Sequence, residues 1–181
     1  MNHIGTKTLE TARLTLRRFE LSDAACMWNN WANDPEVTEY LTWPAHENLG
    51  VTEFVLSQWV PSYEDSASYQ WAIVPKDLGE PIGSIGAIDK RDDIDMISIG
   101  YCIGKKWWNR GYTTEALSTL IRFFFDEVGV NRIESWHDLR NVNSGKVMEK
   151  CGMKLEGIMR QKDKNNQGIC DIVMYAILRT D

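Results

Sequence analysis

The sequence predicts an α+β, or mixed α/β, fold with a largely antiparallel sheet. Three observations support this class: most candidate strands follow one another through short turns, helices alternate with strands only in the second half, and one strongly amphipathic helix separates two strands. The length of 181 residues suits one domain over residues 1–181. With 43% hydrophobic and 25% charged residues, the composition excludes disordered, collagen-like and coiled-coil proteins.

The first third of the chain is predicted to contain one strand followed by helical segments. The strand has alternating leucines, two helices have start signals in a capping serine and an Asp-Pro pair, and a later helix has spaced apolar residues. Gly50 disfavours that later helix. The predicted elements are a strand over residues 13–19, a helix from Ser22 to Trp31, a short helix starting at Asp34-Pro35 and a helix over residues 49–59.

The middle of the chain is predicted to form an antiparallel meander. Alternating apolar residues separated by turn-forming residues indicate strands over residues 69–73, 82–88 and 96–103. The polar run Asp89–Asp93 between the last two strands is predicted to be a solvated loop.

The second half is predicted to alternate helices with strands. Apolar residues keep a 3.6-residue period over residues 114–128, so this helix must pack against the sheet. The strands on either side of it are expected to be parallel. The elements that follow it are a strand over residues 132–137, a short helix over residues 144–151 closed by Gly152, and two strands around residues 163–168.

Charge and cysteine content exclude several kinds of partner. The chain has 20 Lys and Arg against 26 Asp and Glu, hence a net charge of −6, so we expect no direct nucleic-acid partner. Residues 1–14 lack the apolar core of a signal peptide, and no stretch reaches the roughly 20 apolar residues of a membrane span. These features predict a cytoplasmic protein without a membrane partner. Four scattered cysteines and three histidines predict reduced thiols and no metal site.

The junction over residues 103–115 joins a predicted buried strand to the amphipathic helix. The start of a helix presents unpaired backbone N–H groups, which together with the helix dipole attract a phosphate. Gly111 would let the backbone approach that phosphate closely, although a glycine at a helix start fits a tight turn equally well. The junction is therefore a candidate anion-binding site.

Four segments, in their order along the chain, resemble the GNAT superfamily of N-acetyltransferases. They are most similar to the RimJ/RimL branch, whose best-known members acetylate the N-terminal amine of ribosomal proteins. The resemblance implies a GNAT fold: a mostly antiparallel six- to seven-stranded sheet with a splayed parallel strand pair and flanking helices. The segments that carry the resemblance are Ser98–Tyr101, Trp108–Ala116, Asn141–Ser144 and Glu149–Met153.

The resemblance implies that acetyl-CoA is a co-substrate. In the family, backbone amides of an Arg/Gln-x-x-Gly-x-Gly/Ala turn hold the pyrophosphate, and this chain has Trp108-x-x-Gly111-x-Thr113, which departs at the first and last positions. Backbone amides bind phosphate whatever side chains they carry. Pantetheine would lie in the slot between residues 101–103 and 135–137, although burial in the sheet is the expected main role of Cys102. The implied cofactor-binding residues are Cys102, Ile103, Trp108, Asn109, Arg110, Gly111, Tyr112, Thr113, Thr114, Asn141 and Ser144.

Acetyl transfer needs a neutral amine and a proton for the departing thiolate. The resemblance implies that Ser144 lies near the cofactor sulfur as an acid and that Asn141 contacts the pantetheine arm, although both residue types are also ordinary helix caps. The tyrosine acid of other family members is excluded, because Met148 stands at its position.

The general base is left open by the sequence. Relatives with a glutamate base carry it where this chain has Ser98, so Glu134 and His137 on the following strand are the candidates, with Asp138 beside them. A dedicated base is not required if the acceptor is an α-amine, whose reference pKa is about 8 against about 10.4 for lysine.

The predicted activity is that of an acyltransferase acting on a primary amine. The branch implies a protein or peptide N-terminal amine, such as that of a ribosomal protein. A small amine (polyamine, amino acid or antibiotic) and a non-catalytic acyl-CoA-binding module are the alternatives, and a homodimer stays open. Trp28, Trp31 and Trp43 could line an acceptor groove, but core packing is the expected role of most tryptophans.

Overall fold

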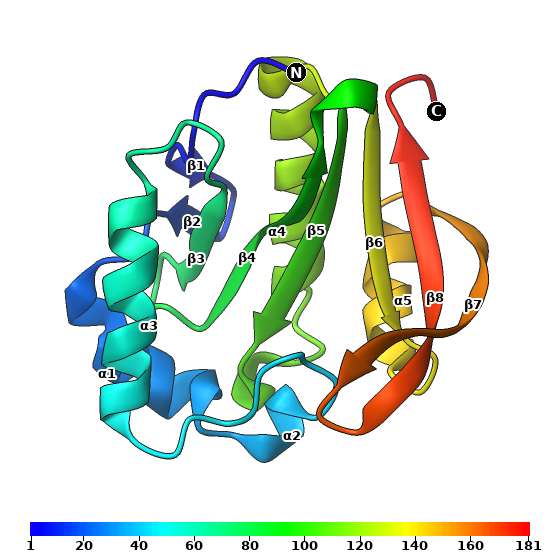
Figure 1. Ribbon diagram of the computed structural model, residues 1–181. Helices are drawn as coiled ribbons and strands as arrows, with labels where there is room; N and C mark the ends of the chain where they lie inside the picture. Colours follow the sequence, from blue (N-terminus) through cyan, green and yellow to red (C-terminus); the bar gives the residue numbers. More distant parts are fainter.

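The computed structural model describes residues 1–181, and its eight strands form one mixed sheet with helices on both faces (Figure 1). The strand order is β1-β2-β3-β4-β5-β6-β8-β7, and all neighbours are antiparallel except β5 and β6. The predicted fold class is confirmed, and the strand beyond the expected number is β1, which is too short to show an alternation. The strands are β1 Leu9–Glu10, β2 Leu14–Arg17, β3 Gln70–Pro75, β4 Gly83–Arg91, β5 Met96–Ile103, β6 Arg132–Asp138, β7 Lys154–Asn165 and β8 Gly168–Leu178.

The helices cover the sheet from both sides. α1 and α3 lie over one face on the side of β2, β3 and β4, whereas α4 and α5 lie behind the opposite face (Figure 1). α1 continues as a π-helical turn over Trp28–Ala32, and α4 continues as another over Phe124–Val128. The α-helices are α1 Ala24–Met27, α2 Pro35–Thr38, α3 Leu49–Ser62, α4 Tyr112–Phe123 and α5 Val142–Lys150. No helix has the length and apolar character that crossing a membrane requires.

Strand β3 is buried on both faces, which explains its nearly continuous apolar sequence. Trp71 and Ile73 belong to the larger core, between the sheet and α4, and Ala72 and Val74 belong to the smaller core under α1 and α3. Full burial of a large apolar side chain contributes about 1.5–3 kcal/mol. The two cores therefore hold the sheet firmly between its helices.

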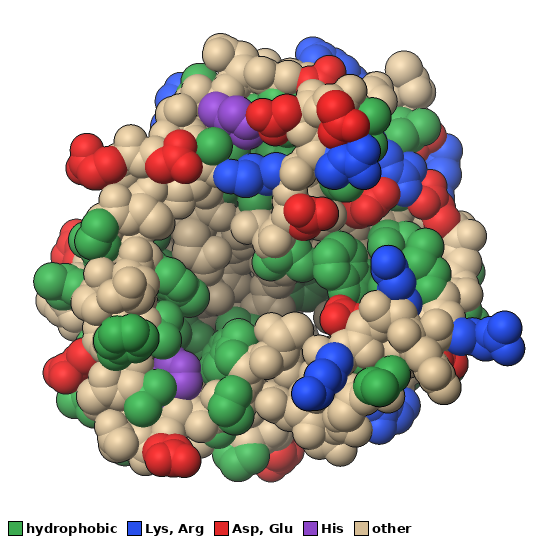
Figure 2. All heavy atoms as spheres, viewed as in Figure 1, with side chains coloured by type: hydrophobic (Ala, Val, Ile, Leu, Met, Phe, Trp, Pro, Cys, Tyr) green, Lys and Arg blue, Asp and Glu red, His purple; other side chains and the backbone are tan.

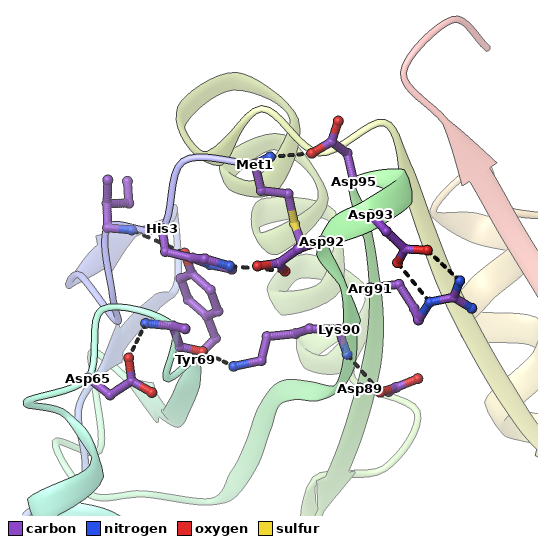
Figure 3. A network of polar contacts seen from close by, with 12 residues as sticks. Met1, His3, Asp65, Tyr69, Asp89, Lys90, Arg91, Asp92, Asp93 and Asp95 are labelled. Atoms are coloured by element: carbon purple, nitrogen blue, oxygen red, sulfur yellow. Dashed lines mark hydrogen bonds and ion pairs between the residues drawn. The ribbon is translucent and has the colours of Figure 1, made fainter.

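The polar run Asp89–Asp93 is not the loop that its composition predicts. Asp89, Lys90 and Arg91 pair with Ser98, Ile97 and Met96 and extend β4, and only Asp92–Ile94 forms a 3₁₀ turn. The prediction was wrong because these side chains are solvent-exposed while their backbone is paired. Figure 3 shows them held by polar contacts at this end of the sheet, where Arg91 pairs with Asp93 at 2.7 Å.

Three helix starts lie earlier than predicted. The first helical segment begins with a 3₁₀ turn at Leu21, and the Asp23 carboxylate, not Ser22, accepts from the Glu20 N–H at 2.8 Å. α4 begins at Tyr112 and α5 at Val142, each two residues before the predicted start. Neither of these two helices has a side-chain cap, and although Asn141 is a favoured N-cap residue type, its side chain does not cap α5. The Asp34 cap of α2 is confirmed, because its side chain accepts from the Glu36 N–H at 2.8 Å.

The parallel strands β5 and β6 are paired over only part of their length. Their register covers Met96–Ser98 against Arg132–Glu134, and beyond it the two strands diverge, as Figure 1 shows. The Ser135 hydroxyl donates to the Ile99 carbonyl at 2.8 Å just past the last paired residues. The diverging segments leave backbone groups of both strands without a strand partner on these edges.

Candidate functional site

A cleft of about 480 Å³ opens where β5 and β6 diverge, bounded by the starts of α4 and α5. Figure 2 shows the face opposite to α4 and α5, which is hollowed over the centre of the sheet, between the helices at left and the β7–β8 hairpin at right. Of the eleven predicted cofactor residues, all except Arg110 line the cleft. The lining residues among them are Cys102, Ile103, Trp108, Asn109, Gly111, Tyr112, Thr113, Thr114, Asn141 and Ser144.

The turn before α4 has the backbone shape of an anion site. Asn109 and Gly111 are both left-handed, with φ of 59° and 77°, which turns the chain sharply into the helix. The first i to i−4 hydrogen bond of α4 joins the Glu115 N–H to the Gly111 carbonyl at 3.0 Å. The N–H groups of residues 112–114 precede that bond and have no helical acceptor, so they are available to a ligand in the cleft.

Arg13 holds this turn from outside the cleft. Its guanidinium donates to the Arg110 carbonyl at 2.9 Å, pairs with Glu115 at 2.7 Å and lies 4.6 Å from the centre of the Tyr112 ring. Glu115 also accepts from the Thr11 hydroxyl at 2.6 Å. These contacts explain why Arg110 contributes its carbonyl to the fold of the turn while its side chain is absent from the cleft wall.

Asn141 and Ser144 bring polar side chains to the cleft wall. Asn141 is the N-cap residue of α5 but its side chain makes no capping bond, so it does not play the capping role that its residue type suggests. The Ser144 side chain lies at the cleft beside the Tyr101 phenol. The Ser144 carbonyl accepts from the Tyr101 hydroxyl at 2.9 Å, which ties α5 to β5 across the splay. Burial raises the pKa of Tyr101, so this phenol stays protonated.

The two candidate bases do not line the cleft. The Glu134 carboxylate accepts from Arg132 Nε at 2.6 Å. The His137 ring is buried against α5, its Nδ1 lies 2.7 Å from the Asp138 carbonyl, and it stacks on Tyr175 at 5.9 Å. Asp138 is not a free base either, because hydrogen bonds from Arg140 hold the pKa of its carboxyl well below the usual range. No carboxylate or imidazole in this region is left free in the cleft.

The remaining predicted residues have structural surroundings. Cys102 lines the cleft with its Sγ 3.3 Å from the Ser84 hydroxyl, and burial raises the pKa of this thiol. Trp31 is fully buried in the smaller core, and Trp43 packs against that core. Trp28 donates from Nε1 to the His46 carbonyl at 3.4 Å. None of these three tryptophans lines the cleft.

Sequence reasoning missed eight residues of the cleft wall, whereas residues 101–103 of the predicted pantetheine slot line it and residues 135–137 do not. Two of the missed residues, Lys146 and Lys150, are one helical turn apart on α5, and a lysine pair at this spacing is the one signal that could have been noticed. The others come from a distant segment or are sequence neighbours of the predicted residues. The missed residues are Val37, Tyr40, Leu41, Trp107, Asn143, Lys146, Val147 and Lys150.

The sequence of this chain is similar to those of known acetyltransferases. The family model described as an acetyltransferase (GNAT) domain matches residues 13–154. The N-acetyltransferase p20 of Bacillus licheniformis is 29% identical over 175 residues, covering 97% of this chain and 98% of the relative.

Solved structures share the architecture over nearly the whole chain. The ribosomal-protein-S5-alanine acetyltransferase from Vibrio fischeri has a TM-score of 0.83 at 20% identity, covering 97% of this chain and 98% of its own. RimL, a ribosomal alpha-N-protein acetyltransferase solved with coenzyme A, has a TM-score of 0.84 at 18% identity, covering 95% of this chain and 98% of its own. At these identities the likeness shows the fold.

Proposed function

The chain belongs to the GNAT acetyltransferase family, and from this we propose that residues 1–181 form a single catalytic domain that acetylates a protein or peptide N-terminal amine. It is an N-acetyltransferase that uses acetyl-CoA as co-substrate. The observation that supports the site best is the pair Asn141 and Ser144, whose polar side chains line the cleft while Asn141 makes no capping bond to α5. We also propose a cytoplasmic location, and a homodimer stays an open proposal.

Different residues of the cleft would bind different parts of acetyl-CoA. The N–H groups of residues 112–114 would hold the pyrophosphate, and the unpaired edge of β5 over residues 101–103 would accept the pantetheine arm. Asn141 would hydrogen-bond that arm. The acceptor amine attacks the thioester carbon, so the C–N bond forms while the C–S bond breaks and sulfur leaves as a thiolate, and the proton that the nitrogen loses passes through solvent to that thiolate. Ser144 would donate a hydrogen bond to that sulfur as its charge develops.

We propose an α-amine as the acceptor because no carboxylate or imidazole lines the cleft to act as a base. An α-amine, with a pKa of about 8, is roughly one-tenth neutral at pH 7, whereas an alkyl amine with a pKa of about 10.4 is almost wholly protonated. A site without a strong base therefore favours the α-amine. The names of two structural relatives, both ribosomal-protein acetyltransferases, agree with this proposal.

We expect short peptides with free N-termini to exceed spermidine and free lysine in kcat/KM near neutral pH. The advantage should narrow as pH rises towards 10, because the alkyl amines then lose their protons. Steady-state thiol release from acetyl-CoA with each acceptor, measured from pH 6.5 to 9.5, tests this. An N-terminally blocked peptide of the same sequence is the control for acetylation at other positions.

Turnover of polyamines or aminoglycosides with inert peptides at every pH would replace the proposed acceptor by a small amine. Tight acetyl-CoA binding without thiol release for any amine would favour the non-catalytic binding module instead.

Lys146 and Lys150 should attract the phosphates of acetyl-CoA. Lys146 has one hydrogen bond, to the Asn143 side chain at 3.5 Å, and Lys150 has no ion-pair partner. Replacing both by alanine should weaken acetyl-CoA binding about tenfold at low salt and flatten its salt dependence, since two exposed charges contribute. Calorimetric titration at low and high salt tests this. The control is Lys105→Ala, because Lys105 is already paired with Glu36 at 2.6 Å outside the cleft wall.

A further inference from the structure

The turn between β7 and β8 is attached to the segment over residues 35–43, called here the α2 segment. The side-chain amide of Asn166 donates to the carbonyls of Thr38 and Trp43, each at 2.7 Å. Its backbone N–H donates to the Leu41 carbonyl at 3.1 Å. Figure 1 shows the two segments side by side below the open end of the splay. One residue thus supplies three hydrogen bonds between parts of the chain that are far apart in sequence.

The same turn is also attached to the end of β6. The Asn165 amide donates to the Asp138 carboxylate at 2.7 Å, and Asp138 pairs with Arg140 at 2.7 Å. The Arg140 guanidinium in turn lies 5.6 Å from the centre of the Tyr40 ring, which belongs to the α2 segment. These contacts close a ring that runs from β6 through the β7–β8 turn to the α2 segment and back.

The α2 segment is a wall of the cleft. Val37, Tyr40 and Leu41 are the only lining residues that come from the first half of the chain. We call the part of the cleft that they line the acceptor end. α2 has four residues, about one helical turn, which is too short to hold its position by its own hydrogen bonds. Its place therefore depends on attachments to its neighbours, of which Asn166 supplies the largest number.

We infer that Asn166 is a specificity-determining residue that fixes the α2 segment as the wall of the acceptor end and so limits the size of the group beside the reacting amine. Asn166 itself touches neither the cleft nor the reacting atoms, so it acts as a positioning residue. The role in size selection rests on the proposed function, because it concerns the amine acceptor. The attachment of the α2 segment by Asn166 does not, and it can be measured without turnover.

Asn166→Asp keeps the shape of the side chain but faces two carbonyls with an acceptor in place of a donor. Gln167→Glu is the matched control, because it adds the same charge in the same turn and the Gln167 side chain makes no hydrogen bond. Amide hydrogen exchange should quicken about tenfold or more at Leu41 and His46 in N166D, given the loss of two hydrogen bonds, and should not change in Q167E. Both amides are hydrogen-bonded in the wild type, to the Thr38 and Ala32 carbonyls.

Size selection is measured with matched pairs of acceptors in wild type, N166D and Asn166→Ala. Peptides beginning with Ala or Trp, and the small amines ethylamine and benzylamine, each supply a small and a bulky member. The ratio of kcat/KM for the small over the bulky member should fall several-fold in both variants, while the acetyl-CoA dissociation constant changes less than about twofold.

Each result decides between the inference and its alternatives. Unchanged exchange at Leu41 and His46 would overturn the attachment, and quickened exchange with an unchanged size ratio would overturn the role in specificity. A loss of acetyl-CoA affinity equal to the loss in kcat/KM would also contradict it, because the wall would then serve the cofactor. A wild type inert towards all four acceptors would instead count against the proposed function, and the exchange data alone would then decide whether Asn166 fixes the segment.

Discussion

Gly111→Glu is expected to abolish acetyl-CoA binding, weakening it by about 100-fold or more, because the site relies on backbone N–H groups at a helix start. Gly111 has a φ of 77°, and its replacement adds strain together with a carboxylate beside the proposed phosphate position. The Arg13 guanidinium lies 3.4 Å from where the new Cβ would stand, so the turn would also shift or lose its support. Calorimetric titration with acetyl-CoA and with CoA measures the effect.

The matched control is Gly79→Glu. Gly79 has a φ of 74° in a turn where nothing lies within 4 Å of the added Cβ, and it does not line the cleft. Both variants should lose a similar stability, about 1–2 kcal/mol from the left-handed conformation, but only Gly111→Glu should lose the ligand. Equal acetyl-CoA affinity in the two variants would remove the turn before α4 from the proposed site.

The fold could be predicted from local patterns because most elements carry their own signal. The amphipathic period of α4 reflects a face that is buried against the larger core, and the apolar run of β3 reflects burial on both faces. The polar end of β4 was missed because its side chains face solvent and its stability comes from pairing with β5, a partner that composition does not reveal. The start of α4 was missed because it depends on the backbone conformation of Gly111, not on a capping side chain.

Most residues that the cleft brings together on the side of α4 and α5 could be found in the sequence because they are nearly contiguous there. Residues 108–114, apart from Arg110, and the pair Asn141 and Ser144 come from two short segments, and both segments line the cleft. The acceptor end could not be predicted, because the α2 segment that forms its wall is far away in the sequence. Tertiary contacts place this segment at the cleft, among them the hydrogen bonds from Asn166. A four-residue helix with apolar neighbours looks like any short connection in the sequence.

The alternation of β6 explains why the base candidates lay outside the cleft. Side chains along a strand point to opposite faces in turn, so Glu134 and His137 cannot share a face. Ile133 belongs to the larger core and His137 lies against α5 on the same face, which leaves Glu134 on the other. The sequence gives the period of the strand but not which face is turned to a ligand.

Ser144→Ala should lower kcat by about 100-fold, the lower range for loss of a positioned acid, without changing the acetyl-CoA dissociation constant by more than about twofold. The Ser144 hydroxyl lies at the cleft, and the neighbouring Tyr101 phenol already donates to the Ser144 carbonyl, so removal of the hydroxyl leaves no buried donor unsatisfied and should not unfold α5. The tie between α5 and β5 also persists, because Tyr101 donates to the backbone carbonyl of residue 144. Single-turnover acetyl transfer and equilibrium binding, measured on the same preparation, separate the two quantities.

Ser118→Ala is the control for Ser144→Ala. Its hydroxyl lies on α4, donates to Cys151 Sγ at 3.2 Å and does not line the cleft, so its loss should leave kcat near the wild-type value. Parallel losses of affinity and rate in Ser144→Ala would assign this hydroxyl to binding of the ground state instead of to the departing sulfur. Wild-type kcat in Ser144→Ala would mean that the thiolate leaves without help from the protein, which is chemically reasonable only if solvent reaches the sulfur in the cleft.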